Sequence, residues 1–267
     1  MKDKEETLKN IIKEEQTRKI INKVFDNQTI MTVHALAKSG NFDVLEFVVS
    51  IGKEAHVFRA VDHSGNFRAV KIYKIETSEF RNMDKYLFGD ERFKKTKKTK
   101  KDIVFAWARK EFKNLELSNQ ARASTPQAIA VKNNVLVLQF VGENGLASKK
   151  LKEENPKDKK TLERYYEQTI EFIARLFYLK ELIHADLSEY NILVKNKKLV
   201  FIDLGQGVLT SHANAKEFFE RDVKNMVHYF SRQGLDKTFE EAIEDIKEKG
   251  KVLKEGKKPK EAKKYGN

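Results

Sequence analysis

The chain has 267 residues, enough for two lobes of ordinary domain size around a cleft and too long for a single peptide-binding module. Its composition is 40% apolar and 35% charged, and the lack of cysteine excludes disulfides, thiolate zinc sites and cysteine nucleophiles. The net charge of +13 favours a polyanionic partner, nucleic acid before membrane, and the other interpretation is a charged surface that serves solubility alone. No stretch reaches the roughly 18 apolar residues of a membrane span, so we expect a cytoplasmic monomer with no membrane partner.

Residues 1–43 are predicted to form two helices ahead of the main domain. Apolar residues recur at helical spacing over residues 8–25 and again over residues 29–38. From residue 44 to residue 75, β-branched and aromatic residues predominate, interrupted by a His-Ser-Gly-Asn turn. This stretch predicts three antiparallel strands.

Residues 76–101 show little periodicity and end in a dense run of lysines. Like charges at this density repel one another, so we expect a mobile basic loop. A helix is predicted over residues 102–121, with Glu111 on the same stripe as apolar residues and therefore facing inward. A hairpin over residues 129–140 completes the first lobe, which we place at residues 44–140.

Residues 141–145 form a polar strip with two glycines, which we interpret as a hinge between lobes. After it we predict a helix over 161–182, short strands over 192–195 and 199–202, and helices over 215–231 and 237–246. The second lobe spans residues 146–248, and residues 249–267 form a basic tail. The fold class is α+β, with an antiparallel β lobe followed by a mostly helical lobe.

The most informative motif is His-Ala-Asp-Leu-Ser-Glu-Tyr-Asn at residues 184–191, followed by a predicted hairpin and Asp203. The hairpin places Asn191 before one strand and Asp203 after its partner, so both side chains converge beside Asp186. Mg²⁺ prefers hard oxygen ligands and keeps waters and substrate phosphates, so one amide and one carboxylate suffice as protein ligands. The six histidines show no metal-binding spacing, and we interpret His184 as an imidazole that braces this turn.

Lys71 lies between apolar residues of a predicted strand, where a buried ammonium group needs an anionic partner. Glu111 on the inward stripe of the following helix is the obvious partner. Such a pair would hold the ammonium group on the α and β phosphates of a nucleotide. The connection over residues 50–57 contains one glycine and alone predicts only a hairpin loop. The order Lys, Glu, Asp, Asn, Asp across two lobes indicates phosphoryl transfer from ATP.

These residues resemble the RIO atypical protein kinases, and within that family the type-1 branch. The likeness covers about residues 44–246 together with the N-terminal helices. It is carried by Gly-Lys-Glu-Ala at 52–55, Ala-Val-Lys-Ile-Tyr-Lys at 69–74, Glu-Arg-Phe at 91–93, residues 107–115, residues 184–193, and Ile-Asp at 202–203 with Gln206.

The resemblance implies a two-lobed protein-kinase-like fold, trimmed of the usual activation segment and peptide-binding subdomains. It implies a serine/threonine protein kinase or ATPase that uses ATP with Mg²⁺ or Mn²⁺ and autophosphorylates on serine. The family acts in maturation of the small ribosomal subunit, so the implied partners are the pre-ribosomal subunit with its rRNA and a protein substrate that the sequence does not identify. In related members the aspartate that matches Asp203 takes the phosphoryl group itself.

The resemblance also assigns roles position by position. Lys71 would contact phosphates and pair with Glu111, Asp186 would be the catalytic aspartate, and Asn191 and Asp203 would bind the metal. The remaining nucleotide-binding residues would be Ser50, Lys53, Glu54 and Val57 in and beside the phosphate loop, with the backbone of Gln139 and Val141 at the adenine.

Some positions depart from the family pattern. Gly205 and Gly207 stand where type-1 relatives usually have serines, so we expect a looser loop after Asp203. Gln139 stands where a glutamate is typical, which matters little if backbone atoms bind the adenine. Two alternatives stay open: a non-catalytic, nucleotide-regulated module that binds the pre-ribosome, and a small-molecule phosphotransferase of the aminoglycoside-kinase kind.

Overall fold

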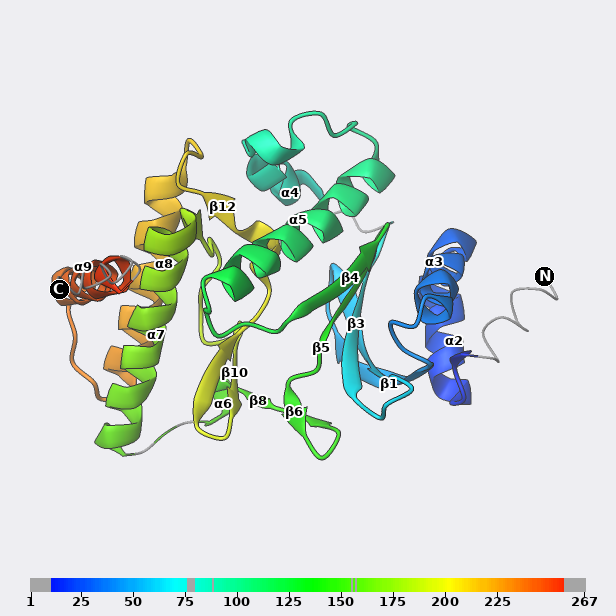
Figure 1. The fold of residues 1–267 in the computed structure, drawn as a ribbon, viewed down its shortest axis with the longest axis horizontal. Coiled ribbons are helices and arrows are strands. Elements are labelled where there is room, and N and C mark those ends of the chain that lie inside the picture. The colour runs from blue at the N-terminus through cyan, green and yellow to red at the C-terminus, as the bar shows by residue number, and fades with distance from the viewer. Residues whose placement is uncertain (1–10, 76–79, 88, 155, 157, 257–267) are drawn as a thin grey trace, which may run out of the picture.

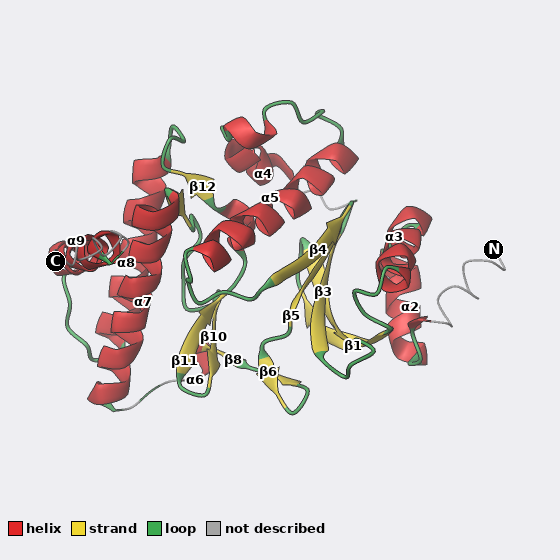
Figure 2. Ribbon diagram, viewed as in Figure 1, coloured by secondary structure: helices red, strands yellow, loops and turns green. Residues whose placement is uncertain are grey.

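The structure is a computed structural model that describes residues 11–75, 80–87, 89–154, 156 and 158–256. Figure 1 shows two lobes along the longest axis of the molecule, and Figure 2 shows that the large sheet belongs to one and the longest antiparallel helices to the other. The α+β class expected from the sequence is confirmed. Within the described residues, no helix is long and apolar enough to cross a membrane.

A five-stranded antiparallel sheet forms the first lobe, in the order β1-β2-β3-β5-β4. Its strands are β1 (Val44–Ile51), β2 (Ala55–Val61), β3 (Phe67–Tyr73), β4 (Ala128–Lys132) and β5 (Val135–Gln139). In the central strand β3, Lys71 lies opposite Val57 of β2 and Leu136 of β5. Since opposite residues share a face of a sheet, this register directs Lys71 to the face that turns toward the second lobe.

Helices α2 (Glu15–Val24) and α3 (Asn27–Lys38) cover the other face of the sheet (Figure 1). Their apolar residues share one buried cluster with the sheet, including Ile21, Ile30 and Phe58. The first helix was expected over residues 8–25, but α2 begins at Glu15, and residues 8–10 lie outside the described residues. Asp26 begins α3 as its cap, because Asp26 Oδ1 accepts a hydrogen bond from the Thr29 backbone N–H at 2.7 Å.

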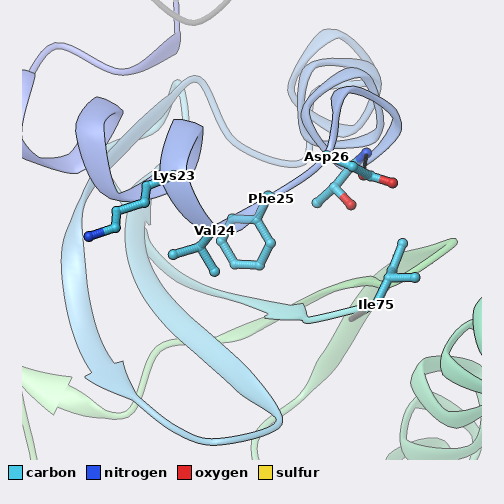
Figure 3. Close-up of a pocket in the computed structure, with 6 residues that line it drawn as sticks. Lys23, Val24, Phe25, Asp26 and Ile75 are labelled. Atoms are coloured by element: carbon cyan, nitrogen blue, oxygen red, sulfur yellow. Dashed lines mark hydrogen bonds between the residues drawn. The ribbon is translucent and has the colours of Figure 1, made fainter. Parts of the chain in front are cut away.

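A small hollow of about 160 Å³ remains where the junction of α2 and α3 meets the end of β3 (Figure 3). Its wall includes Lys23, Phe25, Asp26 and Ile75. Sites for small-molecule ligands have volumes of about 300–1,000 Å³. This hollow is therefore too small to hold a nucleotide.

The structure corrects the expectation of a mobile loop over residues 76–101. The stretch contains helix α4 (Phe80–Leu87) and the 3₁₀ helix η1 (Glu91–Phe93), whereas residues 76–79 and 88 lie outside the described residues. Met83, Tyr86 and Leu87 recur at helical spacing and are buried, as is Phe93. The prediction gave too much weight to the dense run of lysines, which occupies only the exposed end of the stretch, from residue 94 to residue 101.

Helix α5 (Lys100–Gln120) crosses between the sheet and the second lobe (Figure 1). Thr99 caps its first turn by accepting a hydrogen bond from the Asp102 backbone N–H. The stripe with Trp107 and Glu111 is buried, and Glu111 is only 1% exposed. The prediction that Glu111 faces inward is confirmed.

The connection between the lobes is a narrow hairpin of β6 (Gly142–Glu143) and β7 (Leu146–Ala147). It falls on the predicted hinge, residues 141–145. The Arg59 guanidinium donates a hydrogen bond to the Gly145 carbonyl and lies 4.2 Å and 4.7 Å from the ring centroids of Phe47 and Phe67. The sheet of the first lobe therefore anchors this hairpin.

The second lobe packs the long helices α7 (Lys159–Lys180), α8 (Ala215–Arg232) and α9 (Phe239–Glu255) around one apolar core. Its shorter elements are β8 (Lys149–Lys150), α6 (Leu151–Glu154), β9 (Leu182–Ile183), β10 (Ile192–Lys195), β11 (Lys198–Phe201), η2 (Leu204–Gln206) and β12 (Val208–Leu209). Strands β10 and β11 form the antiparallel hairpin expected after the motif at residues 184–191.

The last helix extends beyond its predicted end at residue 246. Thr238 and Glu241 form a reciprocal capping box at its start, and α9 then continues to Glu255. Part of the expected basic tail, residues 249–255, is therefore helical, and residues 257–267 lie outside the described residues. The many lysines after residue 246 obscure the apolar periodicity of this part of the helix in the sequence. In the structure, Ala242, Ile246 and Gly250 are buried along one face.

The packing of α4 can be tested by the stability of a Tyr86→Ala variant. The Tyr86 ring lies 5.0 Å from the Phe218 ring and 6.2 Å from the Trp107 ring, centroid to centroid. Truncation should lower the free energy of unfolding by about 3–5 kcal/mol, measured by urea denaturation. Lys95→Ala, at an exposed residue of the same stretch, should change it by less than about 0.5 kcal/mol. Equal small effects of both substitutions would mean that α4 is not packed.

Candidate active site

A cleft of about 840 Å³ lies between the lobes and is lined by residues of both. Apolar walls face it from two sides: Val57, Ala69 and Leu138 from the sheet, and Leu193 and Ile202 from the second lobe. Its volume suits a small-molecule ligand with a flat ring between these walls. The structure brings every site residue expected from the sequence to this cleft: Ser50, Lys53, Glu54, Val57, Lys71, Glu111, Gln139, Val141, Asp186, Asn191 and Asp203.

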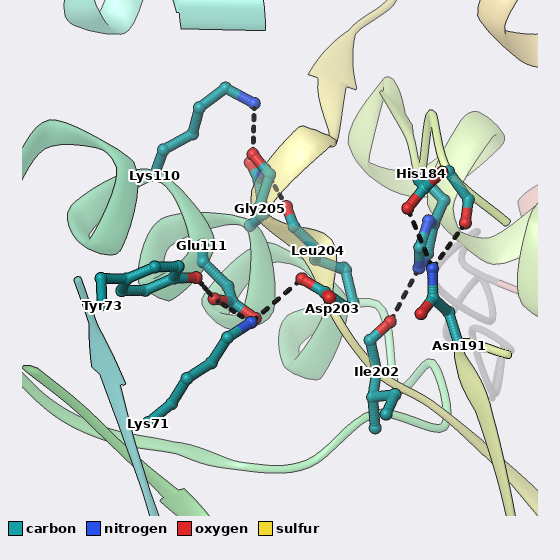
Figure 4. Close-up of polar contacts among 12 residues, drawn as sticks. Lys71, Tyr73, Lys110, Glu111, His184, Asn191, Ile202, Asp203, Leu204 and Gly205 are labelled. Carbon is teal, nitrogen blue, oxygen red and sulfur yellow. Dashed lines mark hydrogen bonds and ion pairs between the residues drawn. The ribbon is translucent and has the colours of Figure 1, made fainter. Parts of the chain in front are cut away.

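Lys71 connects the two lobes through its ammonium group (Figure 4). Lys71 Nζ lies 2.9 Å from both carboxylate oxygens of Glu111 on α5, and 3.0 Å from Asp203 Oδ1 after β11. The Tyr73 hydroxyl donates a further hydrogen bond to Glu111 Oε2. The predicted Lys71–Glu111 pair is present, and Asp203 is a third member that the sequence did not place there.

Lys71 and Asp203 stabilise each other's charge, whereas burial and the charge of Asp203 raise the pKa of Glu111. Burial alone would lower the pKa of Lys71, but the carboxylates of Asp203 and Glu111 outweigh it and raise that pKa well above its ordinary value. Loss of water would raise the pKa of Asp203, but the ammonium of Lys71 overcomes it and lowers that pKa. Lys71 is therefore a cation, and Asp203 is an anion, at neutral pH.

The turn at residues 184–191 holds Asp186 and Asn191 together. Asn191 Nδ2 donates hydrogen bonds to the Asp186 carbonyl at 2.8 Å and to Asp186 Oδ2 at 3.0 Å. Burial and the neighbouring charge of Asp203 raise the pKa of Asp186 to about 6. Asp186 is thus mostly ionised at neutral pH but basic enough to take a proton, as a general base requires.

Asp222 on α8 supports this turn, and the sequence analysis missed it. Asp222 Oδ2 accepts from the Ala185 backbone N–H at 2.7 Å, and Asp222 Oδ1 accepts from the Leu187 N–H at 2.9 Å. Both amides flank Asp186, and Ala185 has the left-handed φ of 62° that this tight turn requires. A signal existed in the sequence, since Asp222 stands four residues from both Phe218 and Met226 on the apolar stripe of α8.

His184 braces the same turn, as expected. Burial lowers its pKa to about 4, so the ring is neutral. His184 Nε2 lies 3.0 Å from the Ile202 carbonyl, an acceptor, so Nε2 carries the hydrogen and donates. The contact connects the turn to the residue before Asp203 (Figure 4).

Asn191 and Asp203 offer the oxygen ligands that Mg²⁺ or Mn²⁺ prefers. The Asn191 amide uses its nitrogen on Asp186, which leaves its oxygen as a potential ligand, and Asp203 uses only Oδ1 on Lys71. Within the described residues there is no cluster of three or more His, Cys, Asp or Glu that could hold a metal by itself. This donor set fits a metal ion that shares its coordination with substrate phosphates.

The remaining predicted contacts lie at the edge of the cleft. Gly52 N–H donates to the Ala55 carbonyl at 2.9 Å, and a Cβ on Gly52 would come within 2.8 Å of that oxygen, so only glycine fits this turn. At the hinge, the Gln139 N–H donates to the Gln127 carbonyl, and the Val141 carbonyl accepts from Ser148. The adenine contact of Gln139 and Val141 stays a prediction.

The loop after Asp203, which the sequence predicts to be looser than in relatives with serines, is hydrogen-bonded to side chains of α5. Buried Lys110 donates to the carbonyls of Gly205 and Gly207, and buried Asn114 donates to the Gly207 carbonyl at 2.8 Å. Burial lowers the pKa of Lys110 to about 7. The glycines lack hydroxyl groups, but their backbone is fixed by side chains of α5.

The chain matches a known family over most of its length. The family model described as the RIO domain matches residues 56–243. The RIO-type serine/threonine-protein kinase Rio1 of Haloferax volcanii is 41% identical over 225 residues, which cover 84% of this chain and 76% of that protein. The protein of the same name from Methanocaldococcus jannaschii is 39% identical over 229 residues, covering 85% and 77%.

Solved structures support the fold. The Rio2 kinase from Chaetomium thermophilum is 19% identical with a TM-score of 0.60, over 85% of this chain and 76% of that one. The same kinase in an ADP/Mg²⁺-phosphoaspartate complex has a TM-score of 0.58 and 19% identity, over 85% and 75% of the two chains. The fold, the family model and the archaeal relatives agree. The chain belongs to the RIO family of serine/threonine protein kinases, in its Rio1 branch, and is an ATP-dependent phosphotransferase.

Proposed function

We propose that this protein autophosphorylates with ATP and a divalent metal ion, and that its kinase or ATPase activity serves the maturation of the small ribosomal subunit. The observation that carries the chemistry is the bond of Lys71 to carboxylates of both lobes, inside the cleft that also holds Asp186 and Asn191. This arrangement provides a cation for phosphates, oxygen ligands for a metal and a base for the acceptor.

The nucleotide is proposed to enter with its adenine between Val57 and Leu193, which line opposite walls of the cleft. Lys71 then binds the α and β phosphates while Glu111 holds its ammonium group in place. Asn191 and Asp203 hold Mg²⁺ or Mn²⁺, which when bound neutralises charge on the transferring phosphate. The loop with Ser50, Lys53 and Glu54 covers the phosphates, and Gln139 and Val141 meet the adenine edge.

Two acceptors suit this cleft. With a serine acceptor, Asp186 takes the hydroxyl proton while the bond from oxygen to the γ-phosphorus forms, the bond from that phosphorus to the bridging oxygen breaks and ADP leaves. With Asp203 as acceptor, its carboxylate oxygen attacks the γ-phosphorus, the bond from that phosphorus to the bridging oxygen breaks and ADP leaves. Water later cleaves the aspartyl phosphate, which releases inorganic phosphate and restores the carboxylate. The phosphoaspartate complex of the Chaetomium thermophilum Rio2 kinase supports the second route.

The proposed ribosomal setting rests on the family resemblance seen in the sequence and on surface charge. Six exposed lysines lie between residues 94 and 101, where they precede and begin α5. A polyanion such as rRNA suits this segment, because lysine side chains neutralise backbone phosphates without reading sequence.

The acceptor can be identified by labelling with γ-labelled ATP and Mg²⁺ in wild type, Asp203→Ala and Asp186→Ala. Hydroxylamine-labile label that Asp203→Ala removes indicates an aspartyl phosphate, because acyl phosphates react with hydroxylamine. Acid-stable label that Asp186→Ala removes indicates serine phosphorylation. Bound nucleotide with no label in wild type would contradict the proposal and favour a non-catalytic module.

The pKa of Asp186 predicts a pH dependence for transfer to serine. The base works only when ionised, and its pKa is about 6. We expect kcat to level off above neutral pH and to fall by about tenfold per pH unit well below pH 6. Steady-state rates from pH 5 to pH 8 test this expectation, with far-ultraviolet circular dichroism as a control for folding. A rate that is flat down to pH 5 would exclude Asp186 as the base.

Replacing the lysines of residues 94–101 with serine should flatten the salt dependence of rRNA binding. Each lost phosphate contact lowers the slope of log K against log salt concentration by about 0.7–0.9. The measurement is fluorescence anisotropy with a labelled rRNA fragment over a salt series. Replacing Lys216 and Lys224, exposed on α8, is the control. An unchanged slope in the first variant would place the contacts elsewhere.

A further inference from the structure

Helix α5 contacts the second lobe through a second group of buried polar side chains, which begins one residue before Glu111. Lys110 Nζ donates to the Gly205 carbonyl at 3.1 Å and also to the Gly207 carbonyl. Asn114 Nδ2 donates to the carbonyls of Leu204 and Gly207, each at 2.8 Å. Lys110 and Asn114 are both fully buried. Four hydrogen bonds from one helix thus hold the carbonyls of residues 204, 205 and 207.

The contact face of the helix allows the loop backbone to approach closely. Lys110 and Asn114 are four residues apart and lie one above the other on α5, with Trp107 one turn before Lys110. A Cβ on Gly205 would come within 2.9 Å of Trp107 Nε1, and a Cβ on Gly207 within 2.9 Å of Asn114 Nδ2. The glycines therefore allow these side chains to reach the backbone.

The orientation of Asn114 is itself fixed. Asn114 Oδ1 accepts from Arg92 Nη2 at 2.9 Å, so its amide nitrogen must face the loop. Arg92 is held in turn by Asp90, whose carboxylate oxygens accept from Arg92 Nε at 2.9 Å and from Nη2 at 2.6 Å. Segment η1, once expected to be mobile, thus supports this contact.

The loop begins at Asp203, whose backbone needs external support. Asp203 has φ 65° and ψ 59°, the left-handed conformation that costs a non-glycine residue about 1–2 kcal/mol. Its carboxylate must nevertheless meet Lys71 at 3.0 Å. The hydrogen bonds to residues 204–207 hold the chain immediately after this strained residue.

Using Lys110 as the donor of such bonds costs free energy, because its ammonium group must be buried away from water. Among the described residues no carboxylate forms a salt bridge with Lys110, whose side-chain nitrogen donates to the two carbonyls and lies 5.7 Å from the centroid of the Trp107 ring. Burial without a charged partner lowers the pKa of Lys110, and the two hydrogen bonds to the loop backbone offset part of that cost. These bonds are therefore what the lysine contributes at this position.

We propose that Lys110 and Asn114 are positioning residues for phosphoryl transfer: they fix the loop of residues 204–207, and through it the carboxylate of Asp203, on the same helix that presents Glu111 to Lys71. Because α5 both carries Glu111 and holds the loop after Asp203, the distance between these two carboxylates around the Lys71 ammonium stays the same when the lobes move. The inference rests on the proposed function, which gives Asp203 its part in metal binding.

Lys110→Met tests the proposal, with Asn114→Leu as the second variant and Lys113→Met, at an exposed residue of the same helix, as the control. ATP affinity is measured in EDTA and in Mg²⁺, together with kcat and the melting temperature. We expect ATP affinity in EDTA within about twofold of wild type, because the adenine walls and Lys71 are untouched. The gain in affinity on adding Mg²⁺ should fall, and kcat should fall about tenfold or more, since small misplacements in an active site cost up to about a hundredfold.

The difference between ATP affinity in EDTA and the gain in affinity from Mg²⁺ separates positioning from general destabilisation. For Lys110→Met we expect a slightly lower melting temperature, because the buried Gly205 carbonyl loses its donor, while the variant stays folded in the assay and kcat falls. Lys113→Met should match wild type throughout. A lower melting temperature together with weaker ATP binding in EDTA in both variants would overturn the proposal. It would also be overturned if Mg²⁺ raised the ATP affinity of both variants as much as it raises that of wild type. If wild type itself gained no affinity from Mg²⁺ and turned over no ATP, the proposed function would fail first.

Discussion

The buried ammonium group of Lys71 is the constraint on which the rest of the site depends. It lies on the central strand of one lobe and forms ion pairs with Glu111 and Asp203. Removing an ammonium group from water costs several kcal/mol, and the two carboxylates offset that cost only while β3, α5 and the end of β11 keep their places. The charge balance of the site therefore depends directly on how the two lobes are arranged.

The surrounding elements hold this arrangement from several directions. Helices α2 and α3 cover the outer face of the sheet and leave its inner face to the cleft. On the other side, Asp222 accepts hydrogen bonds from the backbone on both sides of Asp186, so the base is placed by a buried carboxylate of α8. Phe172 and Phe201 stack at 3.8 Å beneath the hairpin that joins Asn191 to Asp203. Most reactive groups are thus positioned through backbone bonds and packing.

The sequence predicted those parts of the site in which residue type and spacing are local. The motif at residues 184–191, its hairpin and the inward face of Glu111 all follow from short patterns. Asp222 was missed because its partners are backbone amides 35 and 37 residues away, which no local pattern shows. Helix α4 was missed because neighbouring lysines hid three apolar residues at helical spacing. Long-range polar contacts and short helices in charged stretches depend on tertiary packing, which periodicity does not report.

The continuation of α9 to Glu255 changes how its lysines present their charge. Lys247, Lys251 and Lys254 are exposed and follow one another at helical spacing. Gly250 packs against the Tyr178 ring of α7, and the Lys254 ammonium lies 4.9 Å from the centroid of that ring. On a tail, each residue that became ordered against a partner would lose backbone entropy worth about 1–2 kcal/mol. On α9 that entropy is already lost on folding, so the backbone positions of these three lysines are fixed. Their spacing along α9 is set by the repeat of the helix.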